Sequence, residues 1–178
     1  MNEVLIKDKI FEPYLMQQRI EARITELAKQ INRDFKNERV LFIPVLNGSF
    51  MFFSDLMKQV VIDCEIQFVK YASYLGTEST GKVICQLPNT ARTKGETVIV
   101  VEDIVDTGRT MKQIIRDLTE QEAKQIKICS LLLKPGRYDF THTIDYTGFE
   151  IDDDFVVGYG LDYDGAGRNL QHIYKLKD

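Results

Sequence analysis

The segment Val98–Thr110 (VIVVEDIVDTGRT) carries the side chains with the clearest potential for chemistry. Its β-branched apolar run predicts a buried strand, and the polar residues that follow lie at the strand's carboxyl end, where open parallel sheets bind ligands. The turn Val105–Thr110 leads into a helix, whose first N–H groups lack partners and favour an anion. Thr107 and Thr110 add hydroxyl donors, and Gly108 lets the backbone come close. The pattern therefore predicts a phosphate-binding turn.

Two adjacent carboxylates, Glu102 and Asp103, precede that turn. Their mutual repulsion costs free energy unless something cationic offsets it. Ribose hydroxyls can donate to both carboxylates, and a magnesium ion can lie beside them. The alternative is an acidic strand end followed by a helix that Asp106 or Thr107 caps. Because the whole ordered set follows one apolar strand, we favour ligand binding over capping alone.

Two common nucleotide-binding motifs are absent from the sequence. GxxxxGK[ST], the loop of nucleoside triphosphatases, does not occur. Gly158-Tyr159-Gly160 begins a GxG but continues to Asp162 and Tyr163 without the third glycine of the dinucleotide fingerprint. Both classes of nucleotide site are therefore excluded.

Apolar periodicity predicts the elements that position this segment. Helical spacing runs through Leu15–Phe35, and a second helical pattern runs from Gly48-Ser49 to about Val60. Arg39–Leu46 is short and apolar, as in a strand buried on both faces, although its Pro44 cannot donate to a ladder. Val61–Ala72 is expected to be a strand, and Ser73–Lys82 a polar loop.

The second half of the chain repeats the alternation. Strands are expected at Thr97–Val101, Ile126–Leu133 and, last, Phe155–Tyr159. The helix after Arg109 has an apolar face, formed by Met111, Ile114, Ile115 and Leu118. Alternating strands and helices predict an α/β protein with a parallel sheet covered on both sides. No linker divides the chain, so residues 1–178 are expected to form a single domain.

Bulk composition limits the classes of partner. The net charge of −4 offers no basic surface for nucleic acid, although a local site can still bind an anion. No apolar run approaches the roughly 20 residues that cross a bilayer. Cys64, Cys85 and Cys129 are odd in number and form no CxxC pair, which fits a reducing compartment. We expect a cytoplasmic protein that binds neither nucleic acid nor membrane.

VIVVEDIVDTGRT resembles the phosphoribosyl pyrophosphate motif of the phosphoribosyltransferases, in particular their hypoxanthine and hypoxanthine–guanine branch. Further blocks resemble this family in the same order: VLNGSFMFFSDL its pyrophosphate loop, Ser73-Tyr74 and the polar loop after it its closing lid, LLLKPGR its base-reading strand end, and GFEIDDDFVVGYGLDYDGAGRNLQHI its hood. The resemblance covers about Leu15 to Ile173. It implies a type I phosphoribosyltransferase fold, a mainly parallel sheet flanked by helices, with a small C-terminal hood formed by N-terminal residues and about 134–178.

The resemblance implies roles for residues that bind phosphoribosyl pyrophosphate. Glu102 and Asp103 would hold the ribose hydroxyls with Mg²⁺ nearby, and Asp162 would support a second Mg²⁺. The 5′-phosphate would be wrapped by Val105, Asp106, Thr107, Gly108, Arg109 and Thr110. The pyrophosphate would meet Asn47 and Gly48, next to a cis Leu46–Asn47 peptide bond, and Arg168. Ser73 and Tyr74 would belong to the lid.

The resemblance also implies how the base is read. Asp106 would face N7 and act as the catalytic acid or base, Lys134 would donate to O6, Phe155 would stack on the ring, and Val156 would offer its backbone, with Asp162 nearby. Taken alone, each residue has a plainer interpretation: a solvated Lys134, a core Phe155, an Arg168 paired on the surface, an ordinary loop at Ser73-Tyr74. Asp152–Asp154 are expected to be a solvated turn.

The implied reaction transfers the phosphoribosyl group to N9 of hypoxanthine, and of guanine as a further candidate, giving the nucleotide and pyrophosphate in purine salvage. The implied assembly is a homodimer or homotetramer. The alternatives are a nucleic-acid-binding regulator on the same fold and a transferase that prefers xanthine. Two departures stand out: Asn47 replaces a lysine frequent in the family, and Gly165-Ala166-Gly167 replaces bulkier residues, which predicts a more flexible loop before Arg168.

Overall fold

The computed structural model describes residues 2–73, 83–86, 93–139 and 141–177, which form two sheets and three helices. The elements are, in chain order, β1 (Val4–Ile6), β2 (Lys9–Leu15), α1 (Gln17–Asp34), β3 (Val40–Leu46), α2 (Phe50–Met57), β4 (Cys64–Ile66), β5 (Val69–Ser73), β6 (Val83–Gln86), β7 (Thr97–Val105), α3 (Arg109–Glu120), β8 (Gln125–Leu133), β9 (Tyr146–Glu150), β10 (Val156–Val157) and β11 (Ile173–Leu176).

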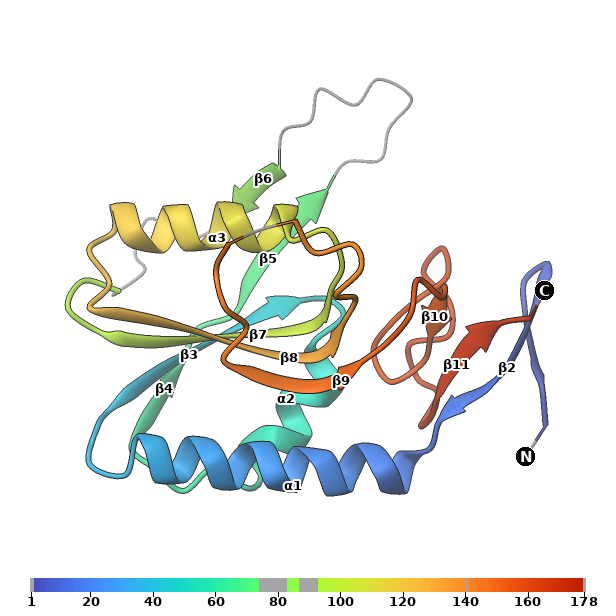
Figure 1. The fold of residues 1–178 in the computed structure, drawn as a ribbon, viewed down its shortest axis with the longest axis horizontal. Helices are drawn as coiled ribbons and strands as arrows, with labels where there is room; N and C mark the ends of the chain where they lie inside the picture. Colours follow the sequence, from blue (N-terminus) through green and yellow to red (C-terminus); the bar gives the residue numbers. More distant parts are fainter. Residues whose placement is uncertain (1, 74–82, 87–92, 140, 178) are drawn as a thin grey trace.

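The large sheet has the order β6-β5-β3-β7-β8-β9, and β4 also pairs with β3. All its pairings are parallel except that of β5 with β6. Figure 1 shows α3 on one face of this sheet and α1 with α2 on the other. The expected α/β architecture, with a parallel sheet covered on both sides, is confirmed.

Strand β7 shows how the two faces are filled. Val98 and Val100 belong to the cluster with the buried residues of α3, whereas Ile99 and Val101 belong to the cluster with α1 and α2. This period of two is the alternation of side chains along a strand. Complete burial of such a side chain contributes about 1.5–3 kcal/mol. The strand that leads to the acidic pair is therefore fixed from both sides.

The helices match the expected apolar faces. α1 buries Ile20, Ile24, Leu27, Ala28 and Ile31, and α3 buries Met111, Ile114 and Leu118. α2 ends at Met57, before the expected end near Val60. No helix among the residues that the structure describes is long and apolar enough to cross a membrane.

Two strand predictions are wrong. Val61–Ala72 is not one strand: β4 and β5 are separate, and each pairs with a different part of β3. Pro44 lies between those two pairings. Because proline has no backbone N–H, the missing donor coincides with a gap in the hydrogen bonding along that edge of β3. Phe155–Tyr159 is neither a full strand nor the last one. β10 covers two residues because the chain turns at Gly158, where φ is +96°, and β11 follows later.

The smaller sheet has the order β1-β2-β11-β10 and is antiparallel throughout. It joins the first strands of the chain to the last ones, and Figure 1 shows it at one end of the large sheet. Sequence reasoning gave no strand at β1, β2, β9 or β11. The boundaries of the hood stay a prediction. β9 lies within residues 134–178, which were predicted to belong to the hood, but it is the edge strand of the large sheet.

Candidate active site

A cavity of about 330 Å³ lies where β3 and β7 end. Several separate segments line it, and they contain most of the predicted donor-site residues. The lining residues are Val45–Gly48, Tyr71, Glu102–Met111, Asp162 and Arg168. Lys134, Phe155 and Val156 are not among the lining residues, so the residues predicted to read the base lie outside this cavity. Ser73 ends β5, and Tyr74 lies outside the described residues.

The turn from β7 to α3 is built for an anion. α3 begins at Arg109 after Gly108, whose φ of +79° lies in the left-handed region that glycine adopts without strain. Neither Asp106 nor Thr107 caps the helix, because no side chain bonds to its first turn. The capping interpretation is therefore wrong. Arg109 is exposed at the N-terminus of α3, where its positive charge meets the positive end of the helix dipole. An anion bound there offsets both positive charges.

The acidic pair lies within β7, which extends to Val105, rather than in the turn after the strand. Burial raises the pKa of Glu102 well above its ordinary value, and the charge of Asp103 adds to this. Burial also raises the pKa of Asp103, while its hydrogen bonds and the charge of Arg168 lower it. The Ile104 N–H donates to Asp103 Oδ1 over 2.9 Å. This pair gains from a cation held close to it.

The donor set at this position fits magnesium held together with a substrate. Within the described ranges, no group of three His, Cys, Asp or Glu side chains is arranged to hold a metal ion alone. Mg²⁺ is usually bound by one or two carboxylates together with substrate phosphates rather than by an all-protein cage. Glu102 and Asp103 would supply the carboxylates, and the turn before α3 would supply a place for the phosphate.

Gly48 packs directly against the acidic pair. A Cβ atom at Gly48 would lie 1.6 Å from Asp103 Oδ2, and one at Gly160 would lie 2.0 Å from the Gly48 carbonyl oxygen. The Gly48 loop, strand β7 and the Gly160 loop thus meet with no room for a side chain at either glycine. The Leu46–Asn47 peptide bond is cis, as the resemblance implied. Asn47 itself is exposed at the rim of the cavity.

Arg168 and Asp162 form the far wall of the cavity. Arg168 Nη2 lies 2.6 Å from Asp162 Oδ1, and its Nη1 donates to the Gly160 carbonyl oxygen over 2.8 Å. The other oxygen of Asp162 accepts from the Gly165 N–H over 2.7 Å. Arg168 is thereby held by groups inside the fold and not by a partner on the outer surface.

Residues at the turn between β1 and β2 hold the turn that carries Asp162. Lys7, in the turn between β1 and β2, donates to the backbone and the carboxylate of Asp164. The Tyr163 hydroxyl donates to Asp8 Oδ1 over 2.9 Å, and the Lys9 ammonium lies over the Tyr163 ring. These contacts tie the small sheet's first turn to the loop that was expected to be flexible.

The base-reading residues depart from their plainer interpretations. Lys134, at the end of β8, is only 7% exposed, so it is not a solvated strand-end residue. Phe155 is 46% exposed, so it is not core, although its ring packs against those of Phe11 and Tyr163. Its open face could stack on an aromatic ligand.

The backbone of Val156 faces the open edge of the small sheet. Val156 pairs with Lys175, and the Leu176 N–H donates to the Phe155 carbonyl oxygen over 2.8 Å. In an antiparallel ladder, this register turns the N–H and C=O of Val156 away from β11. Because β10 ends the strand order, those two groups are available to a planar base edge.

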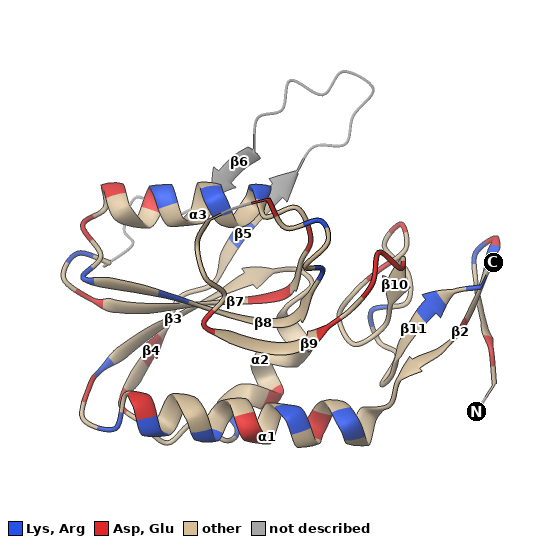
Figure 2. Ribbon diagram, in the orientation of Figure 1, with Lys and Arg blue, Asp and Glu red and all other residues tan. Residues whose placement is uncertain are grey.

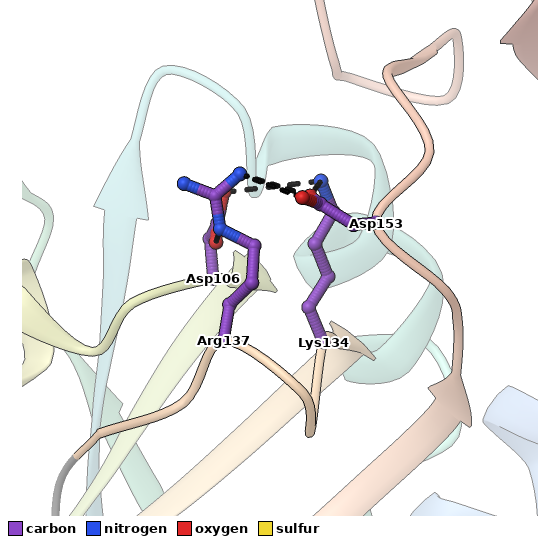
Figure 3. A network of polar contacts seen from close by, with 4 residues as sticks. All are labelled: Asp106, Lys134, Arg137 and Asp153. Atoms are coloured by element: carbon purple, nitrogen blue, oxygen red, sulfur yellow. Dashed lines mark hydrogen bonds and ion pairs between the residues drawn. The ribbon is translucent and has the colours of Figure 1, made fainter.

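Figure 3 shows Asp106 and Lys134 in a network with Arg137 and Asp153. Arg137 Nε lies 2.8 Å from Asp106 Oδ1, and Lys134 Nζ lies 3.8 Å from Asp106 Oδ2. The Nε–H is too poorly aligned to make a hydrogen bond, so the buried Oδ1 receives none from the described residues. Asp106 therefore lies between two cations, with Arg137 next to Oδ1 and Lys134 on the side of Oδ2.

Sequence reasoning missed Arg137 and Asp153. The Lys134 carbonyl oxygen accepts the N–H of Arg137, so the Pro135-Gly136 turn returns Arg137 to Lys134, and this turn was a readable signal. Asp153 was expected to be solvated with its neighbours, and no local pattern distinguishes it. Hydrogen bonds from Arg137 and Lys134 lower the pKa of Asp153, and the same contact to Asp153 raises the pKa of Arg137.

Comparison with known proteins agrees with this geometry. Residues 12–164 match the phosphoribosyl transferase domain family. The chain is 37% identical to the hypoxanthine-guanine phosphoribosyltransferase of Mycobacterium bovis over 91% of this chain and 84% of that protein. It is 36% identical to the hypoxanthine phosphoribosyltransferase of Escherichia coli K12 over 93% and 94%.

A solved structure gives the same result. A hypoxanthine-guanine phosphoribosyltransferase from Bacillus anthracis superposes with a TM-score of 0.86 at 38% identity, over 93% of this chain and 98% of that one. Sequence and fold thus agree over nearly the whole chain. The chain belongs to the phosphoribosyltransferase family.

Proposed function

We propose that the protein transfers the 5-phosphoribosyl group from phosphoribosyl pyrophosphate to N9 of hypoxanthine, releasing pyrophosphate. Guanine is a second acceptor to be tested. The observation that carries the proposal is the position of Asp106. It lines the donor cavity and also lies 3.8 Å from the buried Lys134 ammonium, so one carboxylate borders both substrates.

The donor side needs positioning and charge neutralisation more than covalent chemistry. Displacement at the anomeric carbon builds positive charge on the ribose and negative charge on the leaving pyrophosphate. The turn before α3 binds the 5′-phosphate, Glu102 and Asp103 accept from the ribose hydroxyls, and Arg168 faces the pyrophosphate. Mg²⁺, held beside Glu102 and Asp103 and, as a second ion, near Asp162, would neutralise the leaving group.

The acceptor side reads a 6-oxopurine. Lys134 donates to O6, Phe155 stacks on the ring, and the Val156 backbone meets the edge of the base. Asp106 accepts the N7 proton as N9 attacks, and returns it in the reverse direction. An amino group at position 6 offers a lysine no acceptor, so adenine is disfavoured.

A base panel tests this function. Protein, Mg²⁺ and phosphoribosyl pyrophosphate are incubated with hypoxanthine, guanine, xanthine or adenine, and pyrophosphate release is followed. Turnover is expected with hypoxanthine and not with adenine. Absence of turnover with every purine base contradicts the proposal, and turnover with xanthine ahead of the others transfers the assignment to xanthine.

The competing regulator on the same fold predicts nucleic-acid binding that weakens as salt rises. Figure 2 shows acidic residues interspersed with basic ones along α1 and α3, which gives little support to such a role. Titration with a duplex at low and high salt distinguishes the two functions, since salt-sensitive binding without pyrophosphate release would favour the regulator.

We also propose that the chain forms a homodimer or homotetramer. Phe50, Ile66 and Phe68 expose 43%, 46% and 53% of their surfaces, and the Phe68 ring packs edge-on against Phe53 of α2. Exposed apolar side chains of this size favour burial against a further chain. Light scattering after gel filtration gives the assembly size, and a monomer at micromolar concentration would contradict this proposal.

A further inference from the structure

Lys134 lies between two carboxylates that compete for it. Its Nζ is 3.2 Å from Asp153 Oδ1 and 3.8 Å from Asp106 Oδ2. An ammonium so little exposed is costly to leave without an anion, because water cannot solvate it fully. If the nearer carboxylate were removed, the remaining anion close to Lys134 would be that of Asp106.

Asp153 also holds the second cation of the network. Arg137 Nη1 donates to both oxygens of Asp153, over 2.9 and 3.1 Å, while its Nε lies against Asp106. Figure 3 shows the two cationic side chains converging on Asp153 from the turn after β8. Asp153 itself comes from the segment between β9 and β10, next to Phe155 and Val156. One carboxylate thus links the lysine that reads O6 to the segment that stacks on the base.

We infer that Asp153 is a positioning residue that determines selectivity for 6-oxopurines. It holds the Lys134 ammonium away from Asp106 and available to O6, and it leaves Asp106 free to take the N7 proton. The inference rests on the proposed function. A merely structural ion pair is the alternative, but the Asp153 side chain is 59% exposed, and pairs at that exposure contribute little to stability.

The test compares two nucleotides that differ only at position 6. Inosine 5′-monophosphate has the 6-oxygen, and purine riboside 5′-monophosphate lacks it. Their dissociation constants are measured by titration calorimetry, so that the readout does not depend on turnover. A charge-assisted hydrogen bond to O6 should favour the inosine nucleotide by roughly tenfold or more in the unchanged protein.

Asp153→Asn is expected to remove most of that preference by weakening the inosine nucleotide about tenfold, with little change for the nucleotide without O6. Asp153→Glu should restore part of the preference. Asp152→Asn is the matched control, since Asp152 is the exposed neighbour in the same turn, and it should keep the full preference. Thermal melting of all variants should agree within a few degrees.

A second arm places Asp153→Asn in the Lys134→Ala background, where it should change the preference no further. Equal weakening of both nucleotides by Asp153→Asn, or no effect on either, overturns the inference while the proposed function stands. If the unchanged protein binds both nucleotides equally and releases no pyrophosphate with hypoxanthine, the proposed function fails, and the inference fails with it.

Discussion

The two halves of the site are held in different ways. In the donor half, the main chain sets the geometry. β7 reaches the cavity between two hydrophobic clusters, Gly48 and Gly160 allow the close approaches that a side chain would block, and Gly108 takes a left-handed conformation before α3. The acceptor half stands on side chains, with Lys134 and Arg137 meeting Asp153 across elements of both sheets. Under the proposed function, the donor half, which we call the rigid half, binds phosphoribosyl pyrophosphate, and the acceptor half, which we call the adjustable half, reads the base that distinguishes one reaction from another.

Asp106 belongs to both halves, and its loss should have the largest effect. Asp106→Asn is expected to lower kcat by about a thousandfold, within the range for a general acid or base. Binding of phosphoribosyl pyrophosphate, measured by calorimetry, should remain within a few-fold, since the backbone holds the phosphate. Retention of more than a tenth of the activity would remove Asp106 from proton transfer.

Gly48→Ala tests the rigid half. The new Cβ would lie 1.6 Å from Asp103 Oδ2, so either the loop or the carboxylate has to move. A displacement near 1 Å at a reacting centre can cost about a hundredfold in rate. We expect that loss in kcat/KM together with weaker binding of phosphoribosyl pyrophosphate. Gly136→Ala is the control, because a Cβ there meets nothing within 4 Å, and its activity should be unchanged.

Lys134→Ala tests the adjustable half. Loss of the ammonium should reduce kcat/KM for hypoxanthine roughly tenfold or more and narrow the gap between hypoxanthine and adenine. The KM for phosphoribosyl pyrophosphate should stay the same. Selectivity that survives this substitution would assign the reading of O6 to another group.

The acidic pair predicts how stability changes with pH. Burial raises the pKa of Glu102 and of Asp103 above their unfolded values, so the ligand-free folded state binds more protons. Its free energy of unfolding should therefore decrease as pH rises from the unfolded carboxyl pKa through the raised one. Chemical denaturation across this range, with Glu102→Gln as the comparison, should show a flatter profile in the variant.

The smallest effect is expected at the outer turn. Lys7→Ala removes the contact to Asp164, an exposed pair worth at most about 1 kcal/mol. The KM for phosphoribosyl pyrophosphate should rise less than about threefold, through a looser Arg168. Lys94→Ala breaks a similarly exposed pair with Glu122, and neither residue lines the cavity. This control should leave the KM for phosphoribosyl pyrophosphate unchanged. A tenfold rise in this KM on Lys7→Ala would show that the turn belongs to the rigid half of the site.

The part of the rigid half that lies within Val98–Thr110 could be predicted because it is contiguous in the sequence. Strand, acidic pair, turn and helix follow one another within Val98–Thr110, so local pattern and resemblance both apply. The meeting of Asp106 with Lys134 depends on the β7–β8 register, which pairs Val105 with Leu133 and which spacing alone does not give. Arg137 and Asp153 escaped notice because each is an ordinary charged residue until the fold brings them together.

The missed strands have a related cause. Among them, β1 has three residues and β11 four, which is too short for an alternating pattern to stand out. β9 contains Gly148, whose lack of a side chain lets the Leu131 carbonyl oxygen come close and also breaks the apolar run. Their pairing partners are distant in the sequence or depend on neighbours that must form first.

The pairing of β2 with β11 has a consequence for how the protein is made. These strands join Phe11 to Leu176 and Leu15 to Ile173, so almost the entire chain separates the partners. During synthesis β2 can pair with β1 but must wait for β11, while the large sheet can already assemble. The nascent chain should therefore form its phosphate-binding turn before the part of the site that selects the base. A chain that lacks β11 should still bind the phosphate but should lose its selectivity between bases.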